Sequence, residues 1–229
     1  GIGTSLVRAS EARANEHLPL APDNAEVALH NWINGKNASA CALLEREGNQ
    51  PVRYFLRMER DLDDVAPPVW PEGVTARAFE RGKDERRFYE ASEEAMADHW
   101  GHVPVDFDDW TKRRMGEMFD PALWFVAEED HEPAGVMLGS LSEGIGWVDL
   151  LAVRQRWRRR GLGMALLRQA MVTFRDRGVG RMALGVDAAS PTGATRLYER
   201  AGMHVAQQHA TYGKVLRPGK KLATDVDQE

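Results

Sequence analysis

The chain has 229 residues, of which 43% are hydrophobic and 28% are charged, a composition typical of globular proteins and too apolar for a disordered one. Its formal net charge of −5 argues against nucleic-acid and anionic-membrane partners, and no apolar run approaches the ~18 residues that a membrane span requires. The single cysteine, Cys41, excludes an intramolecular disulfide and a multi-cysteine zinc site. We therefore expect a protein of the reducing cytoplasm.

A proline-rich segment divides the chain. Residues 63–73 include Pro67, Pro68 and Pro71 and end at Gly73. Prolines cannot donate a hydrogen bond to a sheet, so this composition predicts a linker. Residues 1–62 and 74–217 are then separate units, and residues 218–229 form a polar tail that we expect to fray.

After the linker the hydrophobic pattern changes repeatedly between the period of a strand and that of a helix. The predicted strands are 74–79, 123–127, 134–141, 146–153 and 181–186, with a final strand pair within 203–215. The predicted helices are 85–100, 107–119, 161–177 and 191–200. This order predicts an α/β domain built around one mixed sheet.

The most informative segment is the strand 148–153 followed by an arginine-rich loop, which ends in Arg158-Arg-Arg-Gly-Leu-Gly163, and then by a long helix. Glycines permit close backbone approach, and a helix start offers unpaired N–H groups with partial positive charge. This construction favours phosphate or pyrophosphate binding. It lacks the Gly-Lys-Ser/Thr of a Walker loop and the three glycines of a dinucleotide fingerprint. A solvated or nucleic-acid-binding arginine patch and a purely structural loop are the alternatives.

Three segments in this order resemble one family. They are Leu150-Leu-Ala-Val153, the loop 158–163, and the stretch 186–203, which contains Leu-Tyr-Glu-Arg-Ala-Gly-Met. Together they resemble the GNAT superfamily of acyl-CoA-dependent N-acetyltransferases, over roughly residues 74–217. The resemblance implies the GNAT fold, a mixed and mostly antiparallel central sheet flanked by helices, and acetyl-CoA as cosubstrate. Ser190 stands where the family often has Asn, and Met203 where it usually has Phe.

The resemblance also implies roles for individual residues. The cofactor contacts carried over are Leu151, Ala152, Val153, Arg158, Arg159, Arg160, Gly161, Leu162, Gly163, Met164 and Ser190. Tyr198 stands where many members place a tyrosine near the cofactor sulfur, so its hydroxyl is the expected acid for the departing thiolate. The alternative for Tyr198 is an aromatic side chain that only packs in the core.

A base for the acceptor amine is predicted from the strand itself. Period 2 places Asp149 on the same face as Leu151 and Val153, where a carboxylate can accept an amine proton. A structural carboxylate is the alternative, and Glu143 is a weaker candidate for the base.

The acceptor side is expected at the junction of the first two helices of the segment 74–217. His99, Trp100 and His102 are the candidate substrate contacts, with loop packing as their alternative role. No third ligand accompanies the two histidines, so we expect no metal site.

Residues 1–62 resemble a partial second copy of the same unit. Gly1-Ile-Gly-Thr-Ser-Leu6 resembles the segment 161–166, and Asn37–Gly48 resembles 192–202. This pattern indicates a tandem GNAT protein whose first copy begins inside its pyrophosphate loop, so we expect no working cofactor site in it. Its strand edges should pack on the second unit or on another chain, as in a homodimer.

The sequence thus predicts an N-acetyltransferase that moves the acetyl group of acetyl-CoA directly to a primary amine, that of a small molecule. An acyl-CoA-binding regulatory or interaction module without turnover is the alternative. We expect neither a nucleic-acid nor a membrane partner.

Overall fold

The computed structural model describes residues 1–117 and 119–224. The helices are α1 (Ile2–Glu16), α2 (Ala38–Arg46), α3 (Glu85–Met96), α4 (Phe107–Arg114), α5 (Leu162–Asp176) and α6 (Ala194–Arg200). The strands are β1 (Val27–Asn34), β2 (Gln50–Asp61), β3 (Val74–Ala78), β4 (Trp124–Glu129), β5 (Glu132–Ser142), β6 (Ile145–Val153), β7 (Arg181–Asp187) and β8 (His204–Arg217). Short 3₁₀ turns lie at Leu18–Leu20, Pro121–Leu123 and Gln155–Trp157.

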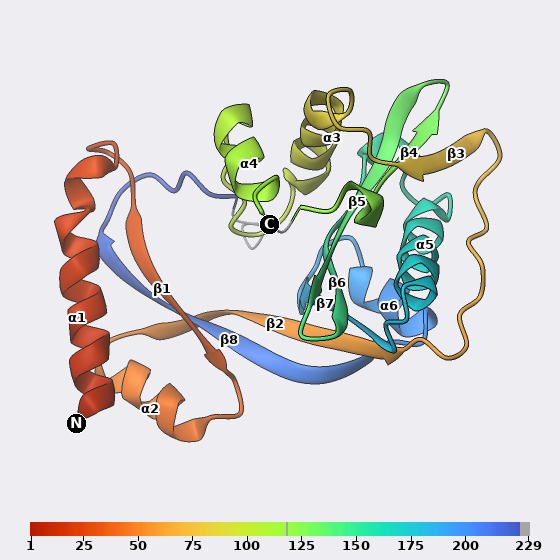
Figure 1. Cartoon of the computed structure of the whole chain (residues 1–229). Coiled ribbons are helices and arrows are strands. Elements are labelled where there is room, and N and C mark those ends of the chain that lie inside the picture. Colours follow the sequence, from red (N-terminus) through yellow and green to blue (C-terminus); the bar gives the residue numbers. More distant parts are fainter. Residues whose placement is uncertain (118, 225–229) are drawn as a thin grey trace.

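One sheet contains all eight of these strands, in the order β1-β8-β2-β7-β6-β5-β4-β3 (Figure 1). Neighbouring strands are antiparallel except β6 and β7, which are parallel. The predicted α/β fold with a mixed, mostly antiparallel sheet flanked by helices is confirmed. No helix in the described part of the chain is long and apolar enough to cross a membrane.

Strand β2, which precedes the proline-rich segment, lies inside the sheet rather than beside it. It pairs with β7 on one side, from Phe55↔Asp187 to Asp61↔Arg181, and with β8 on the other. Strand β8 in turn pairs with β1. The packing of the N-terminal segment on the second unit therefore takes the form of continuous strand pairing.

The same element order, α–β–α–β, occurs at both ends of the chain, as α1-β1-α2-β2 and as α5-β7-α6-β8. The last strand of each segment pairs with the first strand of the other, since β2 pairs with β7 and β8 with β1. In Figure 1, α1 and α2 lie together beside β1 and β8, whereas α5 and α6 lie beside β6 and β7.

The predicted strand pair within 203–215 is wrong, because β8 is one uninterrupted strand, His204–Arg217. Its partners on both sides, β2 and β1, come from the N-terminal segment, so a hairpin is not needed to complete the sheet.

The helix predicted to reach Trp100 ends at Met96 instead. After it, Gly101 takes a positive φ of 74° and its N–H donates to the carbonyl of Thr224 at 2.8 Å.

The tail is hydrogen-bonded further than expected. The backbone of Lys220 forms hydrogen bonds with Asn24 and Glu26, at 2.7 and 2.9 Å. The carbonyl of Thr224 accepts from Gly101, and its N–H donates to the carbonyl of His102 at 2.9 Å, so the tail is held against the α3–α4 junction. Residues 225–229 of the predicted tail lie outside the described residues.

The main core lies between the sheet and helices α3, α4 and α5, with Trp124, Phe88 and Phe174 among its fully buried side chains. Helix α5 packs directly on the strand backbone. A Cβ added to Gly146 would lie only 2.5–2.8 Å from ring atoms of Phe174, so the absence of a side chain there is required for this contact. This packing fixes the last turn of α5 against the start of β6.

Candidate acetyl-transfer site

The site forms where β6 and β7 separate. The two strands pair only from Ile145↔Arg181 to Val148↔Leu184, although β6 continues to Val153 and β7 to Asp187. A bulge in β6 accompanies this, because Val148 pairs with Gly139 and Leu150 with Leu138. Asp149 is the extra residue, and such a bulge bends its strand and re-aims a side chain.

A pocket of about 780 Å³ occupies this opening. Its walls include most of the residues that the sequence assigned to cofactor and catalysis: Asp149, Leu151, Ala152, Val153, Arg158, Arg159, Gly161, Leu162, Gly163, Met164, Ser190 and Tyr198. His99 and Trp100 also line it, whereas Arg160 and His102 lie outside it. The structure therefore brings together residues from β6, the following loop, α5, α6 and the α3–α4 junction.

The start of α5 supplies the anion-binding end of the pocket. Gly161 has a φ of 91°, which favours glycine, and it leads directly into the first turn at Leu162. The first N–H groups of a helix have no partner within it and carry partial positive charge. Gly163 lies against the wall, where an added Cβ would be 3.3 Å from Leu197. This end of the pocket is suited to a phosphate or pyrophosphate.

Four of the five loop arginines are held by carboxylates. Arg154 pairs with Glu94 at 2.6 Å and with Glu132 at 2.8 Å, and Arg156 also pairs with Glu132, at 3.2 Å. Arg158 pairs with Asp98 at 2.6 Å, and Arg160 pairs with Glu129 at 2.5 Å. Arg159 differs from these four, because it has no ion-pair partner among the described residues, takes a φ of 64° and lines the pocket. Because carboxylates already neutralise these four arginines, the loop has little free positive charge for phosphates, which argues against its interpretation as a nucleic-acid-binding patch.

These ion pairs explain where Arg158 and Arg160 lie. The guanidinium of Arg158 also donates to the carbonyls of Ala95 and Val153, so it ties α3 to the loop. Arg160 turns away from the pocket toward Glu129. Hydrogen bonds from Arg160 and then from the buried Trp157 lower the pKa of Glu129 to about 2. Arg158 and Arg160 therefore act on the shape of the loop.

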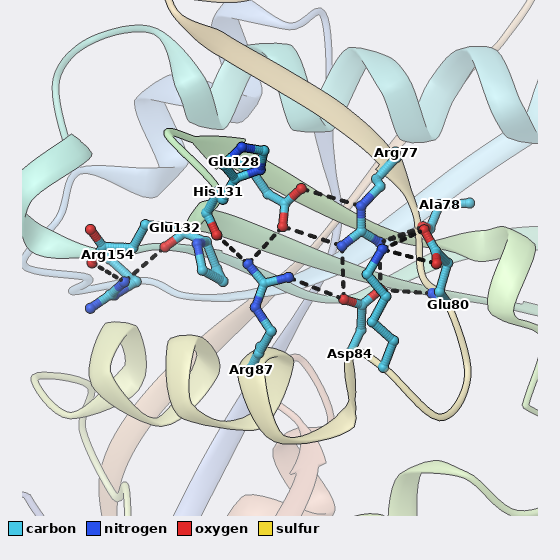
Figure 2. A network of polar contacts seen from close by, with 11 residues as sticks. Arg77, Ala78, Glu80, Asp84, Arg87, Glu128, His131, Glu132 and Arg154 are labelled. Atoms are coloured by element: carbon cyan, nitrogen blue, oxygen red, sulfur yellow. Dashed lines mark hydrogen bonds and ion pairs between the residues drawn. The ribbon is translucent and has the colours of Figure 1, made fainter.

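Helix α3, which carries Glu94 and leads into Asp98, is itself held by a polar network at its start (Figure 2). Arg77 of β3 donates to Asp84 at 2.5 and 2.8 Å, and both Arg77 and Arg87 pair with Glu128. Burial alone would raise the pKa of the fully buried Asp84, but hydrogen bonds from Arg77 hold that pKa below its ordinary value. The network fixes α3 on the sheet at the end remote from the pocket.

The two candidate catalytic groups have shifted pKa values. Tyr198 is 7% exposed, and burial raises its pKa to about 12, which keeps the hydroxyl protonated at neutral pH. Asp149 is exposed along the strand, but the protein around its carboxyl partly excludes water, and this desolvation raises its pKa; a hydrogen bond from Ser140 and the charge of Arg114 oppose the rise. A raised carboxyl pKa is suited to proton exchange near neutral pH.

The two histidines at the α3–α4 junction share a backbone hydrogen bond, from the N–H of His102 to the carbonyl of His99 at 3.1 Å, but their side chains contact different residues. The Nδ1 atom of His99 lies 3.2 Å from Asp98 on the pocket wall, whereas the Nε2 atom of His102 lies 3.4 Å from Glu93 outside the pocket. They diverge because the helix ends at Met96, so the two residues no longer share a helical face. Trp100 packs between His30 and Phe55, at ring distances of 5.8 and 6.2 Å.

Sequence reasoning missed the contribution of β2 to this pocket. Phe55 lines it, and two residues earlier Arg53 forms a buried ion pair with Asp187, whose side chains are 5% and 9% exposed. Arg53 donates to both carboxylate oxygens at 3.0 Å and to the carbonyl of Ala189 at 3.3 Å, and it lies over the ring of Trp100 at 5.7 Å. The available signal was the placement of Arg53, Arg57 and Glu59, at every second or fourth position, among apolar and aromatic residues.

Comparisons with known proteins agree with this geometry. Residues 82–203, more than half of the chain, match the model of the acetyltransferase (GNAT) family. A mycothiol acetyltransferase of Thermomonospora curvata is 34% identical over 205 residues, which cover 88% of this chain but only 65% of that protein.

Solved structures are also similar. A GCN5-related N-acetyltransferase of Sphaerobacter thermophilus is 41% identical with a TM-score of 0.87, covering 98% of this chain and 71% of that one. A tandem GNAT protein from the clavulanic acid biosynthesis pathway shares the fold alone, at 14% identity and a TM-score of 0.67 over 96% of this chain and 71% of that one. By its matched residues, its sheet and its relatives, the chain belongs to the GNAT acetyltransferase family.

Proposed function

We propose that the protein is an acetyl-CoA-dependent N-acetyltransferase that transfers the acetyl group directly to the primary amine of a small molecule. One observation carries the proposal: a single pocket between the separated strands is lined by the start of α5 and by both Asp149 and Tyr198. Acetyl-CoA is the cosubstrate of this family, and the chain's relatives are acetyltransferases.

The residues present fit the cofactor. Gly161 leaves open space at the helix start, since nothing lies within 4 Å of where its Cβ would be. The pyrophosphate would lie against the N–H groups of residues 159–164, with Arg159 as the cation at hand. The pantetheine arm would follow the edge of residues 151–153, which β7 no longer covers, and Ser190 lies on the same wall.

Bound acetyl-CoA supplies an acetyl thioester. Asp149 removes a proton from the acceptor ammonium, directly or through a water, so that the amine nitrogen can form a bond to the acetyl carbon. The carbon–sulfur bond breaks, Tyr198 gives its proton to the departing sulfur, and the second proton that the nitrogen loses as the amide forms returns to Tyr198. The raised pKa values favour these roles, since a protonated Tyr198 can donate and a carboxyl of raised pKa holds a proton more strongly.

Several relatives are named mycothiol acetyltransferase, so the acceptor of that reaction is one candidate acceptor to test. Residues 1–62 are proposed to be a partial copy of the unit at 74–217, because the two share the order α–β–α–β and exchange their last strands. On this view the first copy completes the second copy's sheet and binds no cofactor of its own. A cytoplasmic location is part of the same proposal.

Thermal unfolding with and without millimolar acetyl-CoA tests cofactor binding. A ligand at 100 times its dissociation constant adds about 2.7 kcal/mol to the free energy of unfolding. The shift should disappear in Gly161→Val and persist in Gly82→Val, a matched control because both glycines have positive φ and open space around them. Thiol release in the presence of an amine panel then tests turnover. A shift without release with any amine would favour the alternative, a non-catalytic acyl-CoA-binding module.

A further inference from the structure

A second, polar pocket of about 330 Å³ adjoins the first at Asp149, which lines both. Its other walls include Arg57 of β2, Ser140 of β5, and Glu143 and Trp147 beside and on β6. One cation and two carboxylates therefore face a single small space.

The sheet register explains how Arg57 and Asp149 come to face each other. Arg57 pairs with Gly185 of β7, and the last paired residues of β6 and β7 are Val148 and Leu184. Asp149 is the next residue along β6, so Gly185 lies between it and Arg57. Gly185 lines the first pocket, and nothing lies within 4 Å of where its side chain would begin, which leaves open space beside Asp149 on the way to Arg57.

The guanidinium of Arg57 is oriented but not saturated. It lies over the ring of Trp147 at 4.7 Å, and its Nε is 2.6 Å from Glu59. Its side chain is 29% exposed, its buried Nε makes no hydrogen bond despite this ion pair, and its two Nη atoms have no hydrogen-bond partner among the described residues. A planar guanidinium placed by a ring contact and an ion pair presents its Nη N–H groups in the geometry that binds a carboxylate.

We propose that the acceptor carries a carboxylate as well as its amine, as an α-amino acid does, and that Arg57 binds this carboxylate. The ammonium group then lies toward Asp149, with Glu143 adding to the negative potential of the pocket, and the molecule spans the floor at Gly185. A ligand with both charges complements a pocket with both charges, whereas a simple amine leaves the Nη groups of Arg57 without a ligand partner and Glu59 as its one paired carboxylate among the described residues. This inference deepens the proposed function and rests on it for the reaction, although the binding pocket can be tested alone.

The test compares acceptors that differ by one charge. Glycine, L-alanine, L-phenylalanine and L-lysine are each assayed beside their α-amides, for binding to the free protein and for acetylation with acetyl-CoA. The amide has the less basic amine, so reactivity alone favours it. We expect the best acid to bind and react at least tenfold better than its amide, because a charged hydrogen-bonded pair is lost in the amide.

Variants locate the effect. Arg57→Met should reduce the acid-to-amide ratio to about one and leave the acetyl-CoA dissociation constant unchanged. Arg181→Met, which removes an arginine of β7 that is 52% exposed and lines neither pocket, should keep the ratio. In Gly185→Val the new side chain has room to fit without displacing its neighbours, and it would fill the space that the ligand is proposed to span. Acid binding should therefore weaken at least tenfold.

Equal or better binding of the amides, or an unchanged ratio in Arg57→Met, would overturn the inference. A protein that fails to bind acetyl-CoA but still prefers the acids would contradict only the proposed function.

Discussion

Replacing Arg53 with methionine is expected to destabilise the protein by about 3–5 kcal/mol, the usual effect of removing one partner of a buried ion pair. The pair with Asp187 is almost fully enclosed, at 5% and 9% side-chain exposure. Without the guanidinium, Asp187 keeps the backbone N–H of Ala189 at 2.9 Å but loses its two hydrogen bonds from Nε of Arg53. Arg53 would also no longer hold the carbonyl of Ala189.

The double variant Arg53→Met, Asp187→Asn should lose less stability than the sum of the two single variants, because no buried charge is left alone. The assay is urea unfolding at pH 7. Acetyl-CoA affinity should fall in parallel, since Asp187 begins the loop that carries Ser190.

Arg13→Met is the matched control, because Arg13 pairs with Glu16 at the surface with exposures of 70% and 62%. Exposed pairs contribute about 0–1 kcal/mol. A loss in Arg53→Met no larger than in Arg13→Met, or strict additivity in the cycle, would show that the ion pair does not hold the loop.

Three further predictions concern titrating groups. Tyr198→Phe should lower kcat by at least tenfold and leave acetyl-CoA affinity unchanged, because only the proton donor is removed; an unaffected kcat would contradict the acid role. Asp149→Asn should also lower kcat. Because the pKa of Asp149 is raised in the folded state, the ionised carboxylate disfavours folding of the parent protein at pH 7 but not at pH 3, where the group is protonated. The difference in Tm, variant minus parent, should therefore be more positive at pH 7 than at pH 3. Glu129→Gln should be less stable than the parent at pH 7, because a pKa lowered from 4.5 to about 2 stabilises the fold above pH 4.5. That difference should shrink as the pH falls from 4.5 toward 2, and thermal unfolding across this range checks it.

Much of the cofactor end could be predicted because its signals are local. The strand β6, the glycines 161 and 163 and the apolar stripe of α5 are contiguous in sequence, and their backbone geometry follows from residue type. The structure places Gly161 at a positive φ and starts α5 one residue later. The path from β6 into α5 therefore follows closely what the residues dictate.

The contribution of β2 to the pocket could not be predicted, because the residues that β2 contacts are far apart from it in the chain. Arg53 and Asp187 are 134 residues apart, and their contact depends on β2 lying between β7 and β8. The loop arginines present the same difficulty. Their charges are plain in the sequence, but only the fold shows that Glu94 of α3 and Asp98, just after that helix, neutralise Arg154 and Arg158.

The position of β2 also governs when the molecule can become stable. This strand is synthesised early, yet both of its neighbours in the sheet, β7 and β8, come from the last third of the chain. Contacts of such long sequence separation slow folding, and both edges of β2 remain uncovered until they form. We therefore expect neither half of the nascent chain to fold independently, and the finished protein to unfold in one cooperative transition rather than domain by domain.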